Sequence, residues 1–289
     1  MDAHQKESPS EPKWDLVIVP KTGWFDLHLG DLWRYRDLIF LFVKRDFVAL
    51  YKQTILGPIW YLIQPLLSTL IFTVIFGRIA NIPTDDVPHF LFYLSGLVCW
   101  SYFADCLMAT SNTFIANAGI FGKVYFPRLA VPISIVISNM IKLSIHIVLF
   151  TGFYVYYIAQ GVPLHPTGYL LFLPFLILQM AILGLGFGIL ISSLTTKYRD
   201  LTLLITFGVQ LWMYATPVVY PLSQIPEKFK ILYYLNPMSA VITHFRTMTL
   251  GVGFVNFEAI AISTGITTVV LFLGVIMFSR VEKSFMDTI

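Results

Sequence analysis

Six long apolar stretches divide the chain, and short polar segments separate them. Each stretch holds about 20 residues or more, the length that an α-helix needs to cross the hydrocarbon core of a bilayer. The apolar residues run continuously and do not alternate with polar ones, so the pattern favours helices over the strands of a β-barrel. The sequence therefore predicts an all-α membrane protein with six transmembrane helices, at about 56–76, 90–112, 132–158, 168–194, 201–219 and 257–278.

Two segments of different character precede the first apolar stretch. Residues 1–30 form a polar N-terminal arm that prolines and glycines interrupt, which is typical of a surface tail. Residues 31–54 follow a helical period and are predicted to form an amphipathic helix in the cytoplasmic membrane interface. An ordinary juxtamembrane helix without a ligand is the alternative. One side of the predicted helix carries Leu32, Ile39, Val43, Phe47 and Leu50, and the opposite side carries Arg34, Arg45 and Lys52.

The composition supports a membrane protein and excludes several other classes. Hydrophobic residues make up 57% of the 289 residues and charged residues only 12%, about half of the usual share. The mean hydropathy of +0.75 excludes disordered chains and most soluble enzymes. The net charge of +3 is too small to indicate a nucleic-acid partner. Cys99 and Cys106 lie about 10.5 Å apart along one predicted helix, so we expect free thiols.

The distribution of lysine and arginine predicts the orientation of the chain. Cytoplasmic segments of membrane proteins carry an excess of these residues. If the N-terminus is cytoplasmic, fourteen of them lie in the segments on that side and three lie in the outer loops. We therefore expect a multi-pass membrane protein with both termini in the cytoplasm and an even number of crossings.

The sequence contains no motif that specifies an enzyme or a cofactor site. Gly122-Lys123 lacks the upstream glycine and the following Ser or Thr of a phosphate-binding loop. The six histidines are scattered and predict no metal site. Gly184, Gly186 and Gly188 lie inside an apolar stretch, where small residues favour close helix packing. We expect no catalytic residue, no cofactor and no ATP hydrolysis in this chain.

Eight short motifs follow one another along the chain in an order that is informative. They are Arg45-Asp46, Tyr51-Lys52-Gln53-Thr54, Leu56-Gly57 with Trp60, Gln64-Pro65, Phe126-Pro127-Arg128, Tyr198-Arg199-Asp200, Thr216-Pro217 and Asn236-Pro237. In this order they resemble the membrane subunit of type-2 ABC exporters, in particular the branch that exports O-antigen and teichoic acid. Each motif is weak alone, and the spacing within a six-span chain makes the resemblance specific. It covers nearly the whole chain from about residue 31.

The resemblance implies partners and a division of the chain. In this family two copies of the membrane subunit form a channel, and two copies of a separate ATPase subunit bind ATP and Mg²⁺. Residues 55–289 would be the six-span domain, with a coupling segment at 117–128 and short outer gate helices at 221–246, between spans five and six. The implied ATPase-coupling residues are Gly122, Lys123, Tyr125, Phe126, Pro127 and Arg128.

The resemblance also implies where a lipid-linked sugar chain reaches the channel, at an access loop that matches residues 54–58. Arginine and lysine suit a diphosphate headgroup in a half-wet interface. The general excess of positive charge on the cytoplasmic side is the alternative explanation for these cations. The candidate headgroup residues are Arg34, Lys44, Arg45 and Lys52, with Thr54, Leu56 and Gly57 in the access loop.

Aromatic side chains are the candidates for contact with a passing sugar chain. Sugars present CH faces and hydroxyl groups, which aromatic rings with polar tips can accommodate. Rings that face lipid or form interfacial belts are the alternative. The candidates are Trp60, Tyr61, Phe72, Trp100, Tyr102, Phe103, Trp212 and Tyr214.

Three polar groups inside predicted spans, Asp105, Lys142 and His146, are costly to leave unpaired in a bilayer. Lys142 and His146 share a helix face with Asn139, because these residues are three and four positions apart. Asp105 and Lys142 lie at similar depth, about 15 Å from the cytoplasmic helix ends, so we hypothesise that they pair. Separate contacts with a wet cavity and a proton relay are the alternatives.

These observations favour the transmembrane subunit of an ATP-driven exporter. Its substrate would be a polyprenyl-diphosphate-linked polysaccharide, of the O-antigen kind, that moves from the cytoplasm across the inner membrane. A type-2 ABC exporter of teichoic acid, a drug or a small lipid is the nearest alternative. A proton-driven transporter would need more intramembrane carboxylates and internal repeats. A membrane-embedded transferase would need a catalytic acid or histidine near the interface, where Asp105 does not lie.

Overall fold

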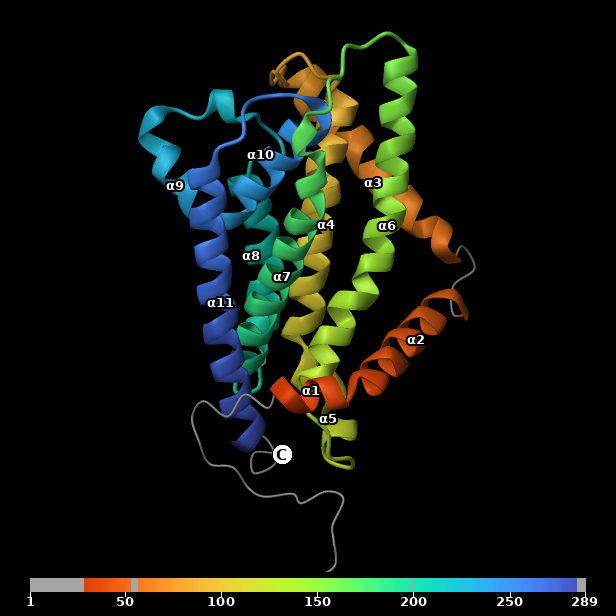
Figure 1. Ribbon diagram of the computed structural model, residues 1–289, viewed down its shortest axis with the longest axis vertical. Helices are drawn as coiled ribbons and strands as arrows, with labels where there is room; N and C mark the ends of the chain where they lie inside the picture. The colour runs from red at the N-terminus through yellow and green to blue at the C-terminus, as the bar shows by residue number, and fades with distance from the viewer. Residues whose placement is uncertain (1–28, 53–56, 199, 285–289) are drawn as a thin grey trace, which may run out of the picture.

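The computed structural model describes residues 29–52, 57–198 and 200–284. Within this part of the chain every regular element is a helix, as the apolar pattern predicts. The long helices form one upright bundle (Figure 1). Nearly all of the predicted N-terminal arm, residues 1–30, lies outside the described residues.

Five helical stretches among the described residues are long and apolar enough to cross a membrane. They agree in position with five of the six predicted spans. They are α3 (Trp60–Phe72) with η2 (Thr73–Ile79), α4 (His89–Ser111), α6 (Ala130–Ala159), η3 (Gly168–Phe172) with α7 (Leu173–Thr195), and α11 (Phe257–Ser284).

The predicted fifth span is present as a shorter helix, α8 (Leu201–Ala215). Its 15 residues extend about 22 Å, which is less than the hydrocarbon core of about 30 Å. The helix ends because Thr216 is extended, with φ −102° and ψ 145°, and because Pro217 disfavours a helical residue before it. The expectation of six full-length spanning helices is therefore met by five, with α8 as a shorter sixth element of the bundle.

The predicted amphipathic segment forms two helices, α1 (Leu29–Arg34) and α2 (Arg36–Lys52). α2 packs against α6, and its Phe42 is buried with its ring 5.8 Å from that of Phe126. The predicted apolar stripe did not include Phe42, because a helical wheel gives the mean direction of apolar residues and not the neighbour that each one meets. Stripe member Ile39 is half-buried against the same cluster. The location of α2 in a membrane interface stays a prediction.

Close contacts through the glycines of α7 build the centre of the bundle. A Cβ atom at Gly184 would lie 2.7 Å from Cys106 Cβ, and one at Gly188 would lie 2.8 Å from Thr110 Cβ, both on α4. On the other side of α7, a Cβ atom at Gly186 would lie 3.0 Å from the backbone of α11. The predicted packing role of these glycines is therefore confirmed. Cys106 is buried as a free thiol, as predicted.

Short helices gather at one end of the bundle, where the resemblance implies outer gate helices (Figure 1). Residues 216–250 are named the outer segment below. Its helices are η4 (Leu222–Gln224), η5 (Glu227–Phe229), α9 (Lys230–Leu235) and α10 (Pro237–Leu250). The opposite end of the bundle holds α5 (Thr113–Phe121) and the C-terminal end of α11 (Figure 1).

Candidate functional site

The segment that is predicted to couple to an ATPase follows α5 and has two parts. Residues 122–125, named the coupling tip below, are exposed, and Tyr125 has 66% of its surface accessible. Phe126, in contrast, is buried, and its ring lies 5.8 Å from the rings of both Phe42 and Phe121. Residues 126–128, named the root of the coupling tip below, therefore connect the exposed tip to a buried aromatic cluster.

Arg128 fastens this root to the last turns of α11. Its backbone N–H donates to Glu282 Oε1 at 3.3 Å, and its Nη1 donates to the Glu282 carbonyl oxygen at 2.7 Å. Burial lowers the pKa of Arg128, and the Glu282 carboxylate partly opposes this effect. The resemblance implies that Arg128 contacts an ATPase, whereas these bonds make it a residue that positions the coupling tip. Glu282 lies more than 150 residues away in sequence, and no local pattern identified it.

The predicted headgroup cations differ in their surroundings. Arg34 and Lys44 are exposed. Arg45 is paired with its neighbour Asp46, with Nη2 2.8 Å from Oδ1, and its guanidinium carbon lies 4.9 Å from the centre of the Phe42 ring. Part of the Arg45 charge is therefore neutralised within α2, which the sequence motif Arg45-Asp46 did not reveal by itself.

The predicted access loop is described only at its end. Gly57 begins η1 (Gly57–Ile59) with a φ of +50°, a left-handed conformation that glycine adopts without strain. The Lys52 side chain, Thr54 and Leu56 lie outside the described residues, so their roles stay predictions.

Four aromatic rings meet where α4, α7 and α8 come together. Trp212 contacts Trp100, Phe103 and Phe187 edge-on, with ring centroids 6.1, 5.2 and 5.1 Å away. Trp100, Phe103 and Tyr102 are 5%, 0% and 2% exposed, so they pack the core of the chain. This burial argues against the predicted channel role of these three side chains, because a covered ring cannot stack on a sugar.

The remaining aromatic candidates keep accessible faces. Trp60, at the start of α3, is 51% exposed, and Tyr214, at the end of α8, is 46% exposed. Tyr61, Phe72 and Trp212 are half-buried. These five side chains stay candidates for contact with a passing sugar chain.

The predicted pair between Asp105 and Lys142 is present. Lys142 Nζ lies 3.5 Å from Asp105 Oδ2 and 5.4 Å from the centre of the Tyr61 ring, so the ammonium group joins α6 to both α4 and α3. His146 makes a different contact, with its Nδ1 3.3 Å from Ser101 Oγ. The three polar groups thus form an ion pair and a separate hydrogen bond.

Two of the recognised motifs meet in the outer segment, through Asn236. Its Nδ2 donates to Thr216 Oγ1 at 2.8 Å, and its Oδ1 accepts from Trp212 Nε1 at 3.1 Å. The same Oδ1 accepts from the Met238 backbone N–H at 3.2 Å, which caps the first turn of α10. Pro237 occupies the first position of α10, where its missing N–H costs nothing. Asn236 therefore holds α8, the Thr216 turn and α10 together.

Arg246 is the most deeply buried cation of the outer segment, with 5% exposure. Its Nη1 donates to the Pro217 carbonyl at 2.6 Å, and its Nη2 donates to the Val218 and Phe92 carbonyls at 2.7 and 3.2 Å. Nε donates to Ser95 Oγ at 3.1 Å. Burial lowers the pKa of Arg246 to about 9. The predicted gate range included Arg246 without singling it out, although an arginine among apolar residues is a signal in itself.

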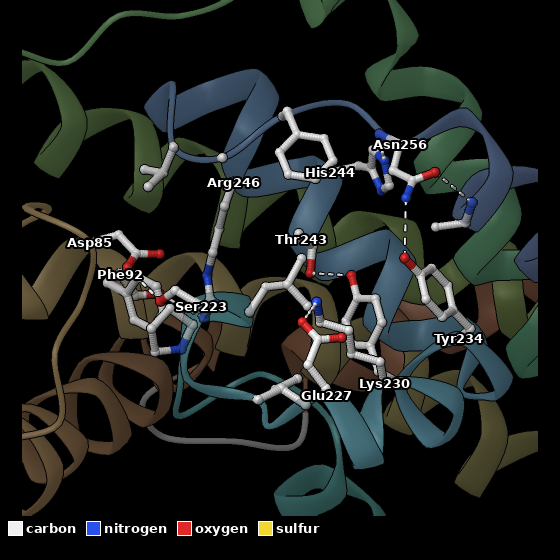
Figure 2. Close-up of a pocket in the computed structure, with 18 residues that line it drawn as sticks. Asp85, Phe92, Ser223, Glu227, Lys230, Tyr234, Thr243, His244, Arg246 and Asn256 are labelled. Carbon is white, nitrogen blue, oxygen red and sulfur yellow. Dashed lines mark hydrogen bonds and ion pairs between the residues drawn. The ribbon is translucent and has the colours of Figure 1, made fainter.

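Two cavities flank the outer segment. One of about 760 Å³ lies beside the end of α8 and residues 80–83, and aromatic side chains, namely Trp212, Tyr220, Phe229 and Tyr233, contribute to its lining. The other, of about 330 Å³, lies on the α10 side of the segment and has many polar groups around it (Figure 2). Tyr233 lines both cavities and separates them. The first cavity has the aromatic lining that contact with a sugar chain requires.

Comparison with known proteins identifies relatives along most of the chain. The ABC-2 type transporter family matches residues 37–250. An O-antigen export system permease protein RfbA of Klebsiella pneumoniae is 28% identical over 87% of this chain and 94% of its own length. The protein of that name from Myxococcus xanthus is 25% identical over 90% and 98%, and the polysialic acid transport protein KpsM of Escherichia coli is 22% identical over 81% and 89%. The family match begins in α2 and ends with α10, so it includes both the coupling tip and the outer segment.

Proposed function

Because this chain belongs to the ABC-2 type transporter family of multi-pass membrane proteins, we propose that it is the transmembrane subunit of an ATP-driven polysaccharide exporter. Its substrate is a polyprenyl-diphosphate-linked glycan of the O-antigen kind, which moves from the cytoplasm across the inner membrane. The match to an O-antigen export permease over 94% of that protein's length carries this proposal. A match of this extent includes the ends of the bundle as well as its spans, and those ends are where partner and substrate bind.

ATP hydrolysis takes place in a separate subunit, of which two copies bind. The sequence has no phosphate-binding loop, so ATP and Mg²⁺ bind in that partner and this chain needs no cofactor. The coupling tip supports a docking role, because its exposed residues stand on a root that Phe126 and Arg128 hold in place. A tip that is fixed at its root transmits movement of the partner to α6 and α11.

The chain crosses the membrane six times, with both termini in the cytoplasm. The excess of lysine and arginine at the end that holds the coupling tip supports this orientation. α8 completes the even number of crossings, because it connects the end of α7 to the outer segment. A homodimer forms the channel, and the exposed face of α8 supports a second copy beside it. The most exposed apolar side chains on this face are Leu203, Leu204 and Phe207.

The substrate enters at the α2 end and leaves beside the outer segment. Its diphosphate contacts the cations of α1 and α2 and the access loop at 54–58, and the sugar chain then passes accessible aromatic rings. It leaves through the aromatic cavity of about 760 Å³, which the outer segment closes as a gate. The residues assigned to this path are Arg34, Lys44, Arg45 and Lys52, followed by Trp60, Tyr61, Phe72, Tyr214 and Trp212.

ATPase activity of the purified chain, alone and co-expressed with its candidate ATPase subunit, tests this proposal. We expect no hydrolysis by the chain alone, and hydrolysis by the complex that the polyprenyl-diphosphate-linked glycan stimulates. Tyr125→Ala, in the coupling tip, should abolish copurification of the two subunits. The matched control is Tyr156→Ala, because Tyr156 is also exposed but lies near the outer end of α6.

Two results would contradict the proposal. The absence of a stable complex with any ABC ATPase subunit would exclude an ATP-driven transporter. A complex that a drug or a phospholipid stimulates, and that the glycan does not, would leave the family assignment intact and would replace the substrate.

A further inference from the structure

The smaller cavity beside the outer segment is not part of the proposed sugar path. It measures about 330 Å³ and lies between η4, η5 and α9 on one side and α10 and the turn before α11 on the other. Figure 2 shows polar side chains around it, among them Asp85 from the turn before α4, Glu227 from η5 and Tyr234 from α9. Tyr233 separates it from the aromatic cavity, so the two spaces share one wall.

Two exposed carboxylates line this cavity, and each of them uses one oxygen in a contact. Asp85 Oδ1 accepts from Ser223 Oγ at 2.8 Å, and Glu227 Oε1 is paired with the Lys230 ammonium group. Among the described residues, neither second carboxylate oxygen has a hydrogen bond. A carboxylate oxygen of this kind is a strong acceptor for a hydroxyl group.

Aromatic rings complete the lining. The rings of Tyr233 and Tyr234 lie 5.4 Å apart at an angle of 76°, and Phe254, which is 70% exposed, lies at the edge of the cavity. The Tyr234 hydroxyl accepts from Asn256 Nδ2 at 3.3 Å, so its own hydrogen is available to a ligand. The cavity therefore presents a donor and flat apolar faces beside its two acceptors.

A left-handed backbone conformation, which aspartate adopts more readily than most residues, places Asp85 at this cavity. Asp85 and the next residue, Asp86, have φ angles of +50° and +62°, in the left-handed region that side chains rarely adopt. A bond from Thr84 Oγ1 to the Val87 carbonyl at 2.6 Å closes the turn around them. The turn therefore fixes the position of Asp85 beside η4, where its side chain meets Ser223.

The lining selects among classes of ligand. Two cations, Lys230 and Arg246, also line the cavity, but Lys230 is paired with Glu227 and Arg246 is bonded to carbonyl oxygens, so the two carboxylates disfavour phosphate. The described residues contain no group of three or more potential metal ligands. The charged side chains also disfavour a purely apolar ligand. A neutral ring with many hydroxyl groups fits instead, because carboxylates accept from its hydroxyls and aromatic rings cover its CH face.

We propose that this cavity binds one neutral sugar residue. The assignment of that sugar to the exported glycan rests on the proposed function, since the glycan emerges on the other side of Tyr233. A sugar held there is kept from sliding back into the aromatic cavity, so the site favours outward movement of the chain.

Saturation-transfer NMR on the complex of this chain with its ATPase subunit, in nanodiscs, tests the site. The probes are glucose, galactose, mannose, N-acetylglucosamine and L-rhamnose, each alone. We expect at least one of them to bind, and Asp85→Asn and Glu227→Gln each to weaken it about tenfold, the loss of one charge-assisted hydrogen bond. Asp86→Asn is the matched control, because Asp86 shares the backbone conformation but does not line the cavity.

The variants separate loss of the site from loss of the fold. Asparagine tolerates a positive φ as aspartate does, so Asp85→Asn and Asp86→Asn place equal demands on the turn. Ser223→Trp, at an exposed position, fills the cavity without removing a carboxylate and should also abolish binding. Binding of none of the five sugars, or equal binding by wild type and the cavity variants, would overturn the proposal.

The outcome is also distinct from that of the proposed function. If the lipid-linked glycan stimulates the ATPase while no sugar binds at the cavity, the sugar site alone is wrong. If sugars bind in the expected manner while the glycan has no effect on the ATPase, the proposed substrate of the transporter is wrong and the cavity is still a sugar site.

Discussion

Two buried arginines fasten the two functional ends of the molecule, in different surroundings. Arg128, at the root of the coupling tip, has a side chain that is 13% exposed and faces Glu282, whose side chain is 29% exposed. Arg246, in the outer segment, is bonded to three carbonyl oxygens and the Ser95 hydroxyl, and the described residues give it no ion pair. One link is a partly exposed cation that bonds the Glu282 backbone carbonyl at 2.7 Å and faces the carboxylate of the same residue at 4.0 Å, and the other is a buried cation held by three backbone carbonyls and a hydroxyl.

The two links differ in the free energy that is needed to open them. When the Arg128–Glu282 link opens, water reaches both charges, so the cost is moderate. When the Arg246 link opens, a cation and several backbone carbonyls lose their partners inside the protein, which costs much more. The coupling tip can therefore shift during a cycle, whereas the junction of α10 with α4 stays fixed.

Replacement of Arg246 should have the largest effect. Arg246→Met leaves its carbonyl partners unsatisfied and should destabilise the fold by about 3–5 kcal/mol. Gly96 is part of this arrangement, because a Cβ atom there would lie 2.6 Å from Arg246 Nη2. Thermal unfolding of the detergent-purified protein measures the effect. A variant as stable as the wild type would show that backbone dipoles do not hold the outer segment.

Loss of Asn236 should come next. Asn236→Ala removes its bonds to Thr216, Trp212 and the first turn of α10, with an expected loss of about 2 kcal/mol. Asn236→Asp keeps the cap of α10 and loses the donor to Thr216, so it should lie between alanine and wild type. Equal stability of the two variants would contradict a role for the Thr216 bond.

Arg128→Met should destabilise the fold by only about 1–2 kcal/mol, because its link is partly wet. Its effect on coupling should be larger, since the tip loses its bond to α11. The ratio of ATPase activity with and without the glycan measures coupling, and thermal unfolding measures stability. If Arg128→Met destabilised the fold as much as Arg246→Met does, the two ends of the molecule would be held equally firmly.

A change of pH should affect the outer segment through His244. Its Nδ1 donates to the Ala240 carbonyl at 2.6 Å, and its Nε2 accepts from the Asn256 backbone N–H at 2.9 Å, so the folded ring is neutral. Burial lowers the pKa of His244, and the bond that the ring donates to the Ala240 carbonyl partly opposes this effect. Below about pH 6.5 the unfolded chain therefore binds a proton at His244 that the folded chain does not bind. The free energy of unfolding should fall as the pH drops below this value.

Hydrogen exchange at about pH 8 and pH 5 checks this expectation, with lower protection of the α10 amides, relative to their intrinsic exchange rates, at the lower pH. The His244→Gln variant should lose the pH dependence. Amides around Arg128 are the internal reference, because this region lies at the opposite end of the bundle from α10 (Figure 1). A uniform loss of protection along the chain would contradict the assignment to His244.

The smallest effect should come from the Asp105–Lys142 pair, whose side chains are 45% and 23% exposed. Asp105→Lys and Lys142→Asp each place like charges side by side, and the double variant restores an opposite pair. We expect the double variant to recover about 0.5–1 kcal/mol relative to the sum of the single ones. Thermal unfolding of the wild type, the two single variants and the double variant measures this interaction free energy. Strictly additive effects would mean that the pair does not contribute to stability.

The features that follow from a single helix could be predicted from the sequence. Apolar length located five spans, and depth along two helices paired Asp105 with Lys142. The apolar run predicts that α8 extends to about residue 219, but the helix ends at Ala215 because Pro217 disfavours a helical conformation of Thr216.

The features that join distant segments could not be predicted in this way. Glu282 meets Arg128 only because α11 ends beside the root of the coupling tip, and Asn236 meets Thr216 only once α8 and α10 are placed. The aromatic candidates show the same limit, since Phe103 and Tyr214 look alike in sequence and only packing buries one and exposes the other. The smaller cavity likewise depends on loops from three parts of the chain.

The glycines of α7 have a mechanical consequence. Gly184 and Gly188 point to one side of the helix and Gly186 to the other, because two residues are about 200° of turn. α7 is thus wedged between α4 and α11 with backbones almost in contact, and any rotation or sliding would drive them together. We therefore expect these three helices to form a stiff slab that moves as one rigid body. Movement during transport is then expected between this slab and helices that pack less closely against it, such as α3.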